Sequence, residues 1–102
     1  MDVVAKKNGE TLYIKVSGAV DTSAAETLRA ELNKIVMEKP PKVIMDLSLV
    51  PTMGSSGIGK ILMFFKSLDN IKSGFEIKGI HENLYSIFKA VKLDKLFPIS
   101  LR

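Results

Sequence analysis

The residues best suited to chemistry in this chain are two consecutive hydroxyl side chains, Ser55 and Ser56. They lie within residues 46–60, which follow a short apolar stretch and open a segment with helical periodicity. In α/β proteins such a strand-to-helix junction lies at the carboxyl edge of the sheet, where functional sites gather. A serine there could belong to a phosphate-binding loop, act as a nucleophile, accept a phosphate or only cap the helix.

A phosphate-binding loop is the first of these alternatives. Gly54, Gly59 and Lys60 have the spacing of that motif, but Ile61 stands where Ser or Thr must hold magnesium. The glycine order of a dinucleotide-binding fingerprint is reversed. A nucleotide-binding domain is therefore a minor alternative.

A serine nucleophile is the second alternative. Ser55 has Gly57 two residues on, but Met53 occupies the position of the other glycine that a nucleophile elbow requires. The chain has one histidine, His81, in a different segment, and no cysteine. That composition leaves no triad base and no His or Cys cluster for a metal. We therefore expect no metal site and no hydrolase chemistry.

A phosphate acceptor and a simple helix cap are the two remaining alternatives. A hydroxyl at a helix N-terminus lies near unpaired backbone amides and the positive end of the helix dipole, so a phosphate there is tolerated. It would also add about −1.5 to −2 charges to a docking surface. Serine is, however, among the commonest N-caps, and local chemistry alone favours the cap.

The elements that position these serines alternate between strands and helices. Asn8-Gly9 separates two alternating stretches and indicates a hairpin. Ser23 to Glu26 has the pattern of a capping box, and an apolar stripe follows to about Met37. Further apolar patterns predict a central strand at 43–47, a helix capped by Ser55 or Ser56 and a strand at 75–80. A third helix is expected after Glu82, with a core stripe of Leu84, Ile87, Phe88 and Val91, followed by a helical turn and an edge strand. We expect one α/β domain over residues 1–102, with a mixed four- to five-stranded sheet opened by a hairpin and packed with three to four helices.

Composition limits the classes of partner. Lys and Arg number 15 against 11 Asp and Glu, a formal net charge of +4, but the lysines are scattered along the chain. Because nucleic-acid binding usually concentrates charge on one face, we expect no nucleic acid. The longest apolar run, residues 61–65, is far below the roughly 20 residues of a membrane span, and no signal peptide is evident. We expect a cytoplasmic protein without a membrane partner, and a free sheet edge that would allow a weak homodimer.

The second predicted helix has two faces. At about 100° per residue, an apolar stripe falls on the side expected to face the sheet: Ile58, Ile61, Leu62, Phe65 and Leu68. Ser56, Lys60 and Met63 fall on the far side, with Phe64 on the shoulder. A methionine outside a complete stripe suits an adaptable contact surface, so this side is a candidate partner face.

Three segments resemble the STAS domain of bacterial anti-sigma factor antagonists. The loop Met53-Gly54-Ser55-Ser56-Gly57-Ile58-Gly59 is similar to the family's Met-Asp-Ser-Ser-Gly-Leu-Gly. Gly18-Ala19-Val20-Asp21 is similar to its Gly-Glu-Leu-Asp, and residues 84–97 resemble its late helix and Leu-Asp-Lys-Leu-Phe segment. The resemblance spans nearly the whole chain and implies the STAS fold.

The resemblance also implies a function. In that family the first serine of the pair is phosphorylated by an anti-sigma factor, a kinase of the histidine-kinase-like ATPase fold, and phosphorylation breaks the complex that frees the sigma factor for transcription. By position the acceptor is Ser55, with Ser56 as its neighbour. Such a protein is a substrate and a binding module, so the resemblance implies no catalytic residue, no cofactor and no enzyme activity. The partner-binding residues expected here are Asp21, Met53, Gly54, Ser55, Ser56, Gly57, Lys60, Met63 and Phe64.

Two positions depart from the family pattern. Gly54 replaces the aspartate before the serines, and Ala19 replaces the glutamate near Asp21. Both changes remove negative charge beside the expected acceptor. A constitutive STAS interaction module without the phosphorylation switch therefore stays open as the alternative.

Overall fold

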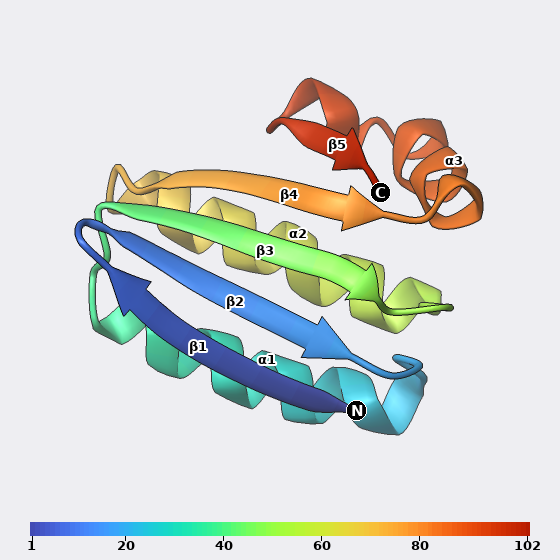
Figure 1. Cartoon of the computed structure of the whole chain (residues 1–102), viewed down its shortest axis with the longest axis horizontal. Coiled ribbons are helices and arrows are strands. Elements are labelled where there is room, and N and C mark those ends of the chain that lie inside the picture. Colours follow the sequence, from blue (N-terminus) through green and yellow to red (C-terminus); the bar gives the residue numbers. More distant parts are fainter.

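The computed structural model describes the whole chain, residues 1–102. Strands and helices alternate after an opening hairpin (Figure 1). In chain order the elements are β1 (Asp2–Asn8), β2 (Thr11–Ser17), α1 (Thr22–Met37), β3 (Lys42–Leu49), α2 (Ser55–Asn70), β4 (Gly74–Ile80), α3 (Glu82–Ala90), the 3-10 helix η1 (Leu93–Lys95) and β5 (Ile99–Leu101). This confirms the predicted α/β class and the predicted order of elements.

The five strands form one mixed sheet in the order β1-β2-β3-β4-β5. β1 is antiparallel to β2, and the remaining neighbours are parallel. The hairpin is confirmed, but Asn8 pairs with Thr11, so its two loop residues are Gly9 and Glu10. Gly9 has φ +65°, a left-handed conformation that glycine adopts without strain.

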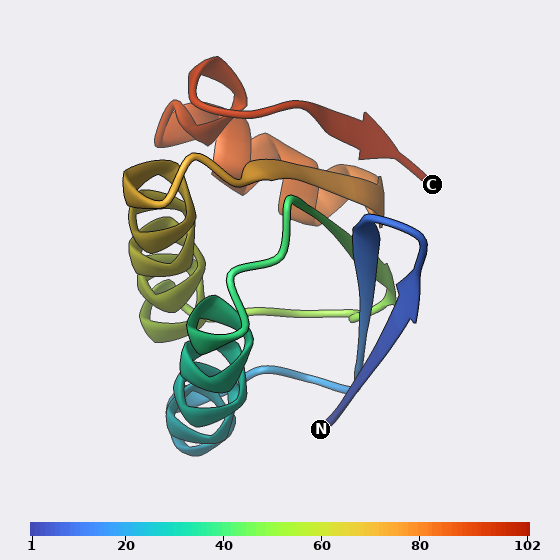
Figure 2. The same ribbon diagram turned by 90° about the vertical axis from the view of Figure 1, so that its left-hand side faces the viewer.

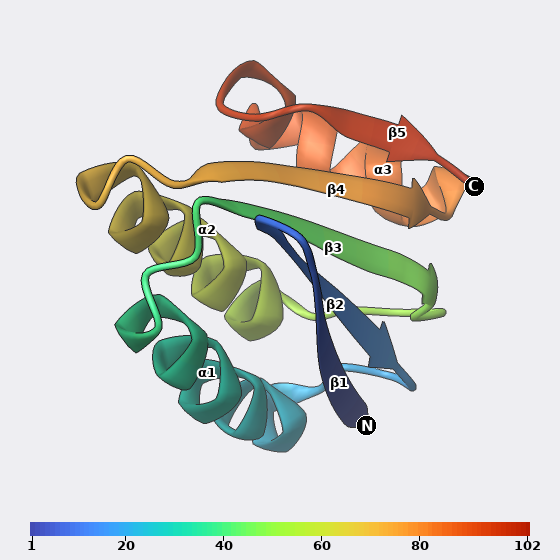
Figure 3. The same ribbon diagram turned by 60° about the vertical axis from the view of Figure 1, so that its left-hand side comes forward.

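The helices cover one face of the sheet. Right-handed crossovers between consecutive parallel strands place the connecting helices on the same side. Figure 2 shows α1 and α2 side by side on that face, and Figure 3 shows α3 behind β4 and β5. A core of 23 buried apolar residues fills the space between the layers. The opposite face of the sheet is left open.

β3 is the central strand, as predicted. Val43, Met45 and Leu47 are fully buried beneath the helices. Asp46 and Ser48 alternate with them and lie half-buried on the open face. β3 therefore carries the chain straight from the core to the loop that precedes Ser55.

The N-cap residues of α1 and α2 differ from those predicted from the sequence. Asp21, not Ser23, is the N-cap of α1, and its Oδ1 accepts a hydrogen bond from the Ala24 N–H at 2.8 Å. Gly54, not a serine, is the N-cap of α2 and supplies no side-chain cap. An aspartate oxygen two residues upstream satisfies the first turn of α1, so the predicted capping box does not form.

The orientation of α2 corrects the expected partner face. Its buried residues are Gly57, Ile61, Phe64 and Leu68, whereas Ile58, Leu62 and Phe65 are only half-buried. Phe64 is 3% exposed and packs edge-to-face on Phe75, with ring centroids 5.5 Å apart. Phe64 is therefore a core residue and not a direct partner contact. Because α1 packs beside α2, the buried arc of α2 is turned toward it, and a single-helix pattern does not contain that information.

The predicted core stripe of α3 is also only half right. Leu84 and Phe88 are buried, but Ile87 and Val91 are 46% and 56% exposed. The apolar stripe of α3 is wider than the part of the helix that packs on the sheet. Its remaining apolar side chains, Ile87 and Val91, face α2 across a groove.

Candidate functional site

Two loops at the carboxyl edge of the sheet are joined by backbone hydrogen bonds. Val20 forms an isolated parallel bridge with Met53. The Val20 N–H donates to the Thr52 carbonyl and the Gly54 N–H donates to the Val20 carbonyl, both at 3.0 Å. These bonds hold the N-termini of α1 and α2 together, so Asp21 and Ser55 come from adjacent helix starts although they are 34 positions apart in the sequence.

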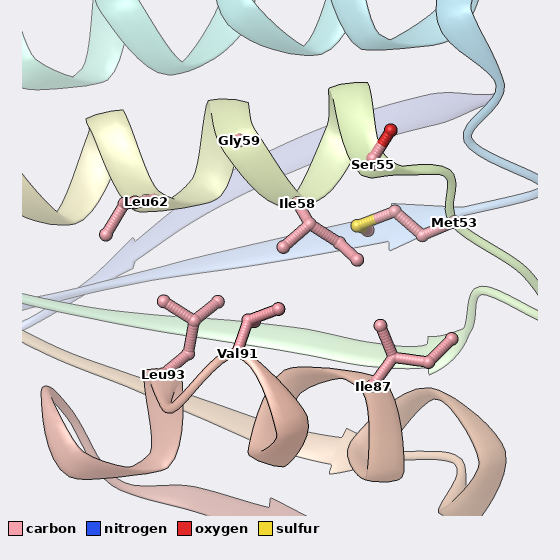
Figure 4. A pocket seen from close by; sticks show the side chains of 8 residues that line it. All are labelled: Met53, Ser55, Ile58, Gly59, Leu62, Ile87, Val91 and Leu93. Atoms are coloured by element: carbon pink, nitrogen blue, oxygen red, sulfur yellow. The ribbon is translucent and has the colours of Figure 1, made fainter.

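Ser55 is the first residue of α2, and its side chain is exposed. Figure 4 shows its hydroxyl pointing away from the apolar side chains below it. The first turn of α2 has neither a side-chain cap nor an acidic residue. Its amide N–H groups and the positive end of the helix dipole are therefore uncompensated by protein groups. A negative group attached at Ser55 would be stabilised at this position.

Gly57 has a packing reason to be glycine. A Cβ at this position would lie 2.7 Å from Met53 Cγ and 2.9 Å from Val20 Cγ1. Both Gly57 and Met53 are buried, so they lie beneath the surface around Ser55 rather than projecting from it. These two expected partner-binding residues instead hold the loop that presents Ser55.

An apolar groove of about 410 Å³ runs between α2 and α3, with Ser55 at its rim. Figure 4 shows Ile58 and Leu62 pointing across it toward Ile87, Val91 and Leu93. Met53 lies in its floor beside Ser55, and Gly59 lines one wall without adding a side chain to it. The groove places a broad apolar surface directly beside the hydroxyl that was singled out from the sequence.

The other side of α2 faces α1 and carries a small ion-pair cluster. Lys60 Nζ lies 3.4 Å from Glu26 Oε1, and Arg29 Nε lies 3.1 Å from Glu26 Oε2. The hydrogen bond from Arg29, followed by that from Lys60, keeps the pKa of Glu26 below its ordinary value. The Arg29–Glu26 pair is exposed and adds little to stability, whereas the Lys60 side chain is partly buried. Met63, 59% exposed, lies beside this cluster and is a surface residue as predicted.

The nucleotide-loop alternative does not fit this geometry. Only Gly54 precedes α2, whereas Gly59 and Lys60 lie within its second turn. Their backbone N–H groups are therefore in helical hydrogen bonds rather than in an open cradle. Lys60 is directed toward Glu26. The spacing of the motif is present without the loop that gives the motif its chemistry.

The structure gathers some of the expected residues and separates others. Asp21, Gly54 and Ser55 meet at the paired helix starts. Met63 lies eight positions, about 12 Å of helix rise, from Ser55, on the side toward α1. The groove residues Ile87 and Val91 were missed as surface residues. Their signal was an apolar stripe on a short helix that is wider than one sheet contact needs.

Comparison with known proteins decides the family. The family model of the STAS domain matches residues 2–102. The chain belongs to the STAS domain family. The family resemblance is thereby confirmed, and the expected fold is confirmed by its match to solved structures, among them a STAS domain protein from Planctomyces limnophilus.

Several relatives of this STAS domain carry regulatory names. It is 24% identical over 96 residues to the anti-sigma-B factor antagonist of Listeria monocytogenes, covering 94% of this chain and 84% of that protein. It matches the crystal structure of an anti-sigma factor antagonist from Mycobacterium paratuberculosis at TM-score 0.88 and 23% identity, covering 97% and 84% of the two chains. The phosphorylated form of the Bacillus cell fate determinant SpoIIAA matches at TM-score 0.76 and 19% identity, covering 96% and 90%. None of the helices of this STAS domain is long and apolar enough to cross a membrane.

Proposed function

We propose that this STAS domain is an anti-sigma factor antagonist that regulates transcription and is controlled by phosphorylation of Ser55. Unphosphorylated, it binds an anti-sigma factor and releases a sigma factor. The anti-sigma factor is a serine kinase of the histidine-kinase-like ATPase fold. The observation that carries the proposal is the position of Ser55, exposed at an uncapped helix start on the rim of an apolar groove. The relatives named as antagonists support it.

The fold of the domain tolerates a phosphate at this position. The hydroxyl points outward and lies at the N-terminus of α2, whose first turn contains no acidic side chain. The dipole and free amides of the first turn stabilise negative charge by about 0.3–1 kcal/mol at an exposed site. Phosphorylation therefore leaves the domain folded.

The docked complex does not tolerate the same phosphate. The groove beside Ser55 is lined mainly by apolar side chains, among them Ile58, Leu62 and Val91. A partner that buries this surface must strip water from any charge on its rim. A phosphate with about −1.5 to −2 charges makes that desolvation costly, so the complex dissociates.

The partner surface centres on the two helix starts. Asp21, Gly54, Ser55 and Ser56 form its polar part, and the groove toward α3 forms its apolar part. Met53 and Gly57 shape this surface from beneath. Lys60 and Met63 extend it along α2 on the side toward α1.

The domain receives the phosphate and does not catalyse its transfer. None of the side-chain hydrogen bonds in the structure involves the Ser55 hydroxyl, so no base is arranged to activate it. Proton removal and the nucleotide therefore come from the kinase partner.

A specific observation favours the second candidate, a constitutive STAS module. Gly54 supplies no carboxylate at the α2 start, and Ala19 supplies none in the neighbouring loop. If a kinase orients magnesium-ATP through those groups, binding persists without phosphate transfer.

One experiment separates the two candidates. The domain is incubated with an anti-sigma kinase and ATP, and its intact mass and the modified residue are determined. We expect one phosphate on Ser55, absent in Ser55→Ala and retained in Ser56→Ala. We also expect Ser55→Asp to weaken the complex at least about tenfold in titration calorimetry, because a charge is then desolvated in the interface. Binding without modification, under conditions that modify another antagonist, identifies the constitutive module, and no binding at all overturns both.

A further inference from the structure

The open face of the sheet carries a basic hollow that the proposed function does not use. It has a volume of about 270 Å³. Its lining residues lie on the face of the sheet that α1 and α2 leave uncovered; Figure 2 shows the two helices on the other face. Lys6, Lys15 and Lys78 line it, from β1, β2 and β4. None of the three forms an ion pair, whereas Lys42 on the same sheet is paired with Glu76 at 3.1 Å.

The strand register places these charges in two neighbouring rows. Lys15 pairs with Asp46, and Asp46 pairs with Lys78, so one carboxylate lies between two lysines. Lys6 and Tyr13 pair in the next row. Neighbouring strands are about 4.8 Å apart, so Lys15 and Lys78 lie about 10 Å apart across the sheet.

The carboxylate in the middle of the row does not neutralise the hollow. Partial burial opposes ionisation of Asp46, but hydrogen bonds from Ser48 and the charges of Lys78 and Lys15 outweigh it, and its pKa lies below the ordinary value. Asp46 is therefore negative at neutral pH, against three positive lysines. The floor between the charges is apolar: Val4 is 62% exposed and Tyr13 is 37% exposed. Lys78 Nζ lies 5.8 Å from the centre of the Tyr13 ring.

We infer that this hollow, Val4-Lys6-Tyr13-Lys15-Asp46-Lys78, binds an extended acidic segment of a partner protein. The positive charge selects an anionic occupant. The negative Asp46 at the centre repels a compact phosphate, whereas carboxylates spaced along a peptide reach the lysines on either side of it. Alternate side chains of an extended peptide are ~7 Å apart, within reach of flexible lysines. The methylene groups of these same acidic side chains pack on Val4 and Tyr13.

A second copy of the chain is a poor occupant of this surface. A two-fold interface brings the same patch of both subunits together. Three unpaired lysines would then face three others across a desolvated contact, which is unfavourable. The hollow and the Ser55 groove lie on opposite sides of the sheet, so the acidic segment binds whether or not Ser55 is phosphorylated.

The test uses the whole domain and three soluble probes observed by backbone amide NMR. The first is an acetylated, amidated peptide Asp-Leu-Asp-Ser-Asp-Leu-Asp, the second has Asn for every Asp, and the third is inorganic pyrophosphate. We expect the acidic peptide to give saturable shifts at Val4, Tyr13, Lys15 and Asp46 but not along Ser55 to Leu62. The Asn peptide and pyrophosphate bind at least about tenfold more weakly.

Matched variants test the charges. The double variant Lys15→Gln/Lys78→Gln lowers the affinity for the acidic peptide about tenfold. The control Lys66→Gln/Lys95→Gln removes the same charge from exposed sites elsewhere and changes that affinity by less than about twofold. Asp46→Asn tightens binding severalfold, a gain that misfolding does not produce. Four outcomes would each overturn the inference. The Asn peptide could bind as tightly as the acidic one, or pyrophosphate could bind more tightly. The shifts could be confined to the Ser55 groove, or no saturable shift could appear up to millimolar peptide.

Discussion

Met53 packs so closely on Gly57 that its Cγ would lie 2.7 Å from a Cβ at that position. Met53 is also bridged to Val20 on the neighbouring loop. The glycine that follows the serine pair therefore has a structural purpose. It lets the two loops close on the first turn of α2 and fixes the position of Ser55.

A comparison of two helical glycines tests this packing. Gly57→Ala introduces a methyl group against Met53 and Val20, and we expect it to lower the free energy of unfolding by about 1–3 kcal/mol. Gly59→Ala meets nothing within 4 Å and gains helix propensity, so it should raise stability by up to about 1 kcal/mol. Urea denaturation of both variants measures the difference. A Gly57→Ala protein as stable as Gly59→Ala would show that the contact does not constrain the loop.

Two variants of Asp21 distinguish its role as the N-cap of α1 from a role in partner binding. Asp21→Ala removes the acceptor for the Ala24 N–H, and we expect a loss of about 1 kcal/mol in the free energy of unfolding. Asp21→Ser keeps a capping oxygen without the charge and should be nearly as stable as the native chain. If the anti-sigma factor reads the carboxylate, the serine variant binds more weakly despite its stability. Native affinity in calorimetry would restrict Asp21 to capping.

The two sides of α2 can be compared by placing one charge on each. Val91→Asp puts a carboxylate in the groove beside Ser55, at a position that is 56% exposed, so the domain should fold normally. Binding of the anti-sigma factor should weaken by about tenfold or more, because the charge is desolvated in the complex. Met63→Asp, 59% exposed on the side toward α1, should also fold and weaken binding. Circular dichroism controls for folding, and unchanged affinity of either variant removes that side from the interface.

Asp46 makes stability depend on pH in a defined direction. Its pKa in the folded domain is below the ordinary value, so its carboxylate stabilises the fold fully above the unfolded pKa of about 3.9. That contribution disappears as the pH falls through the folded pKa. Asp46→Asn should therefore be less stable than the native domain at neutral pH and equally stable at pH about 2. Denaturation midpoints at both values measure this, and a gap that grows in acid would contradict the prediction.

Local patterns predicted much of this fold because they reflect short-range physics. Alternation in residues 12–16 and the Asn8-Gly9 signal specified the hairpin, and the apolar residues Val43 to Met45 with Leu47 specified the central strand. The loop of Ser55 was found because its residue types and order are unusual. Cap identity was wrong at both helices, since several neighbouring residues can accept the same amide hydrogen bond.

The surface beside Ser55 was not predictable from one element at a time. Phe64 was placed toward a partner but is covered by neighbouring elements, while Val91 was placed in the core but is exposed. Each depends on which neighbouring element packs against the helix, and this is a long-range contact.

The amino-acid sequence by itself determined the alternation of strands and helices, the family and the serine at the start of the second helix. These depend on periodicity and on residue types within a few positions. Only the tertiary structure decided that Asp21 and Ser55 share one edge, that an apolar groove borders the serine and that three lysines converge on the open face. Those arrangements arise from strand register and helix packing, which bring distant residues together through contacts that no local pattern encodes.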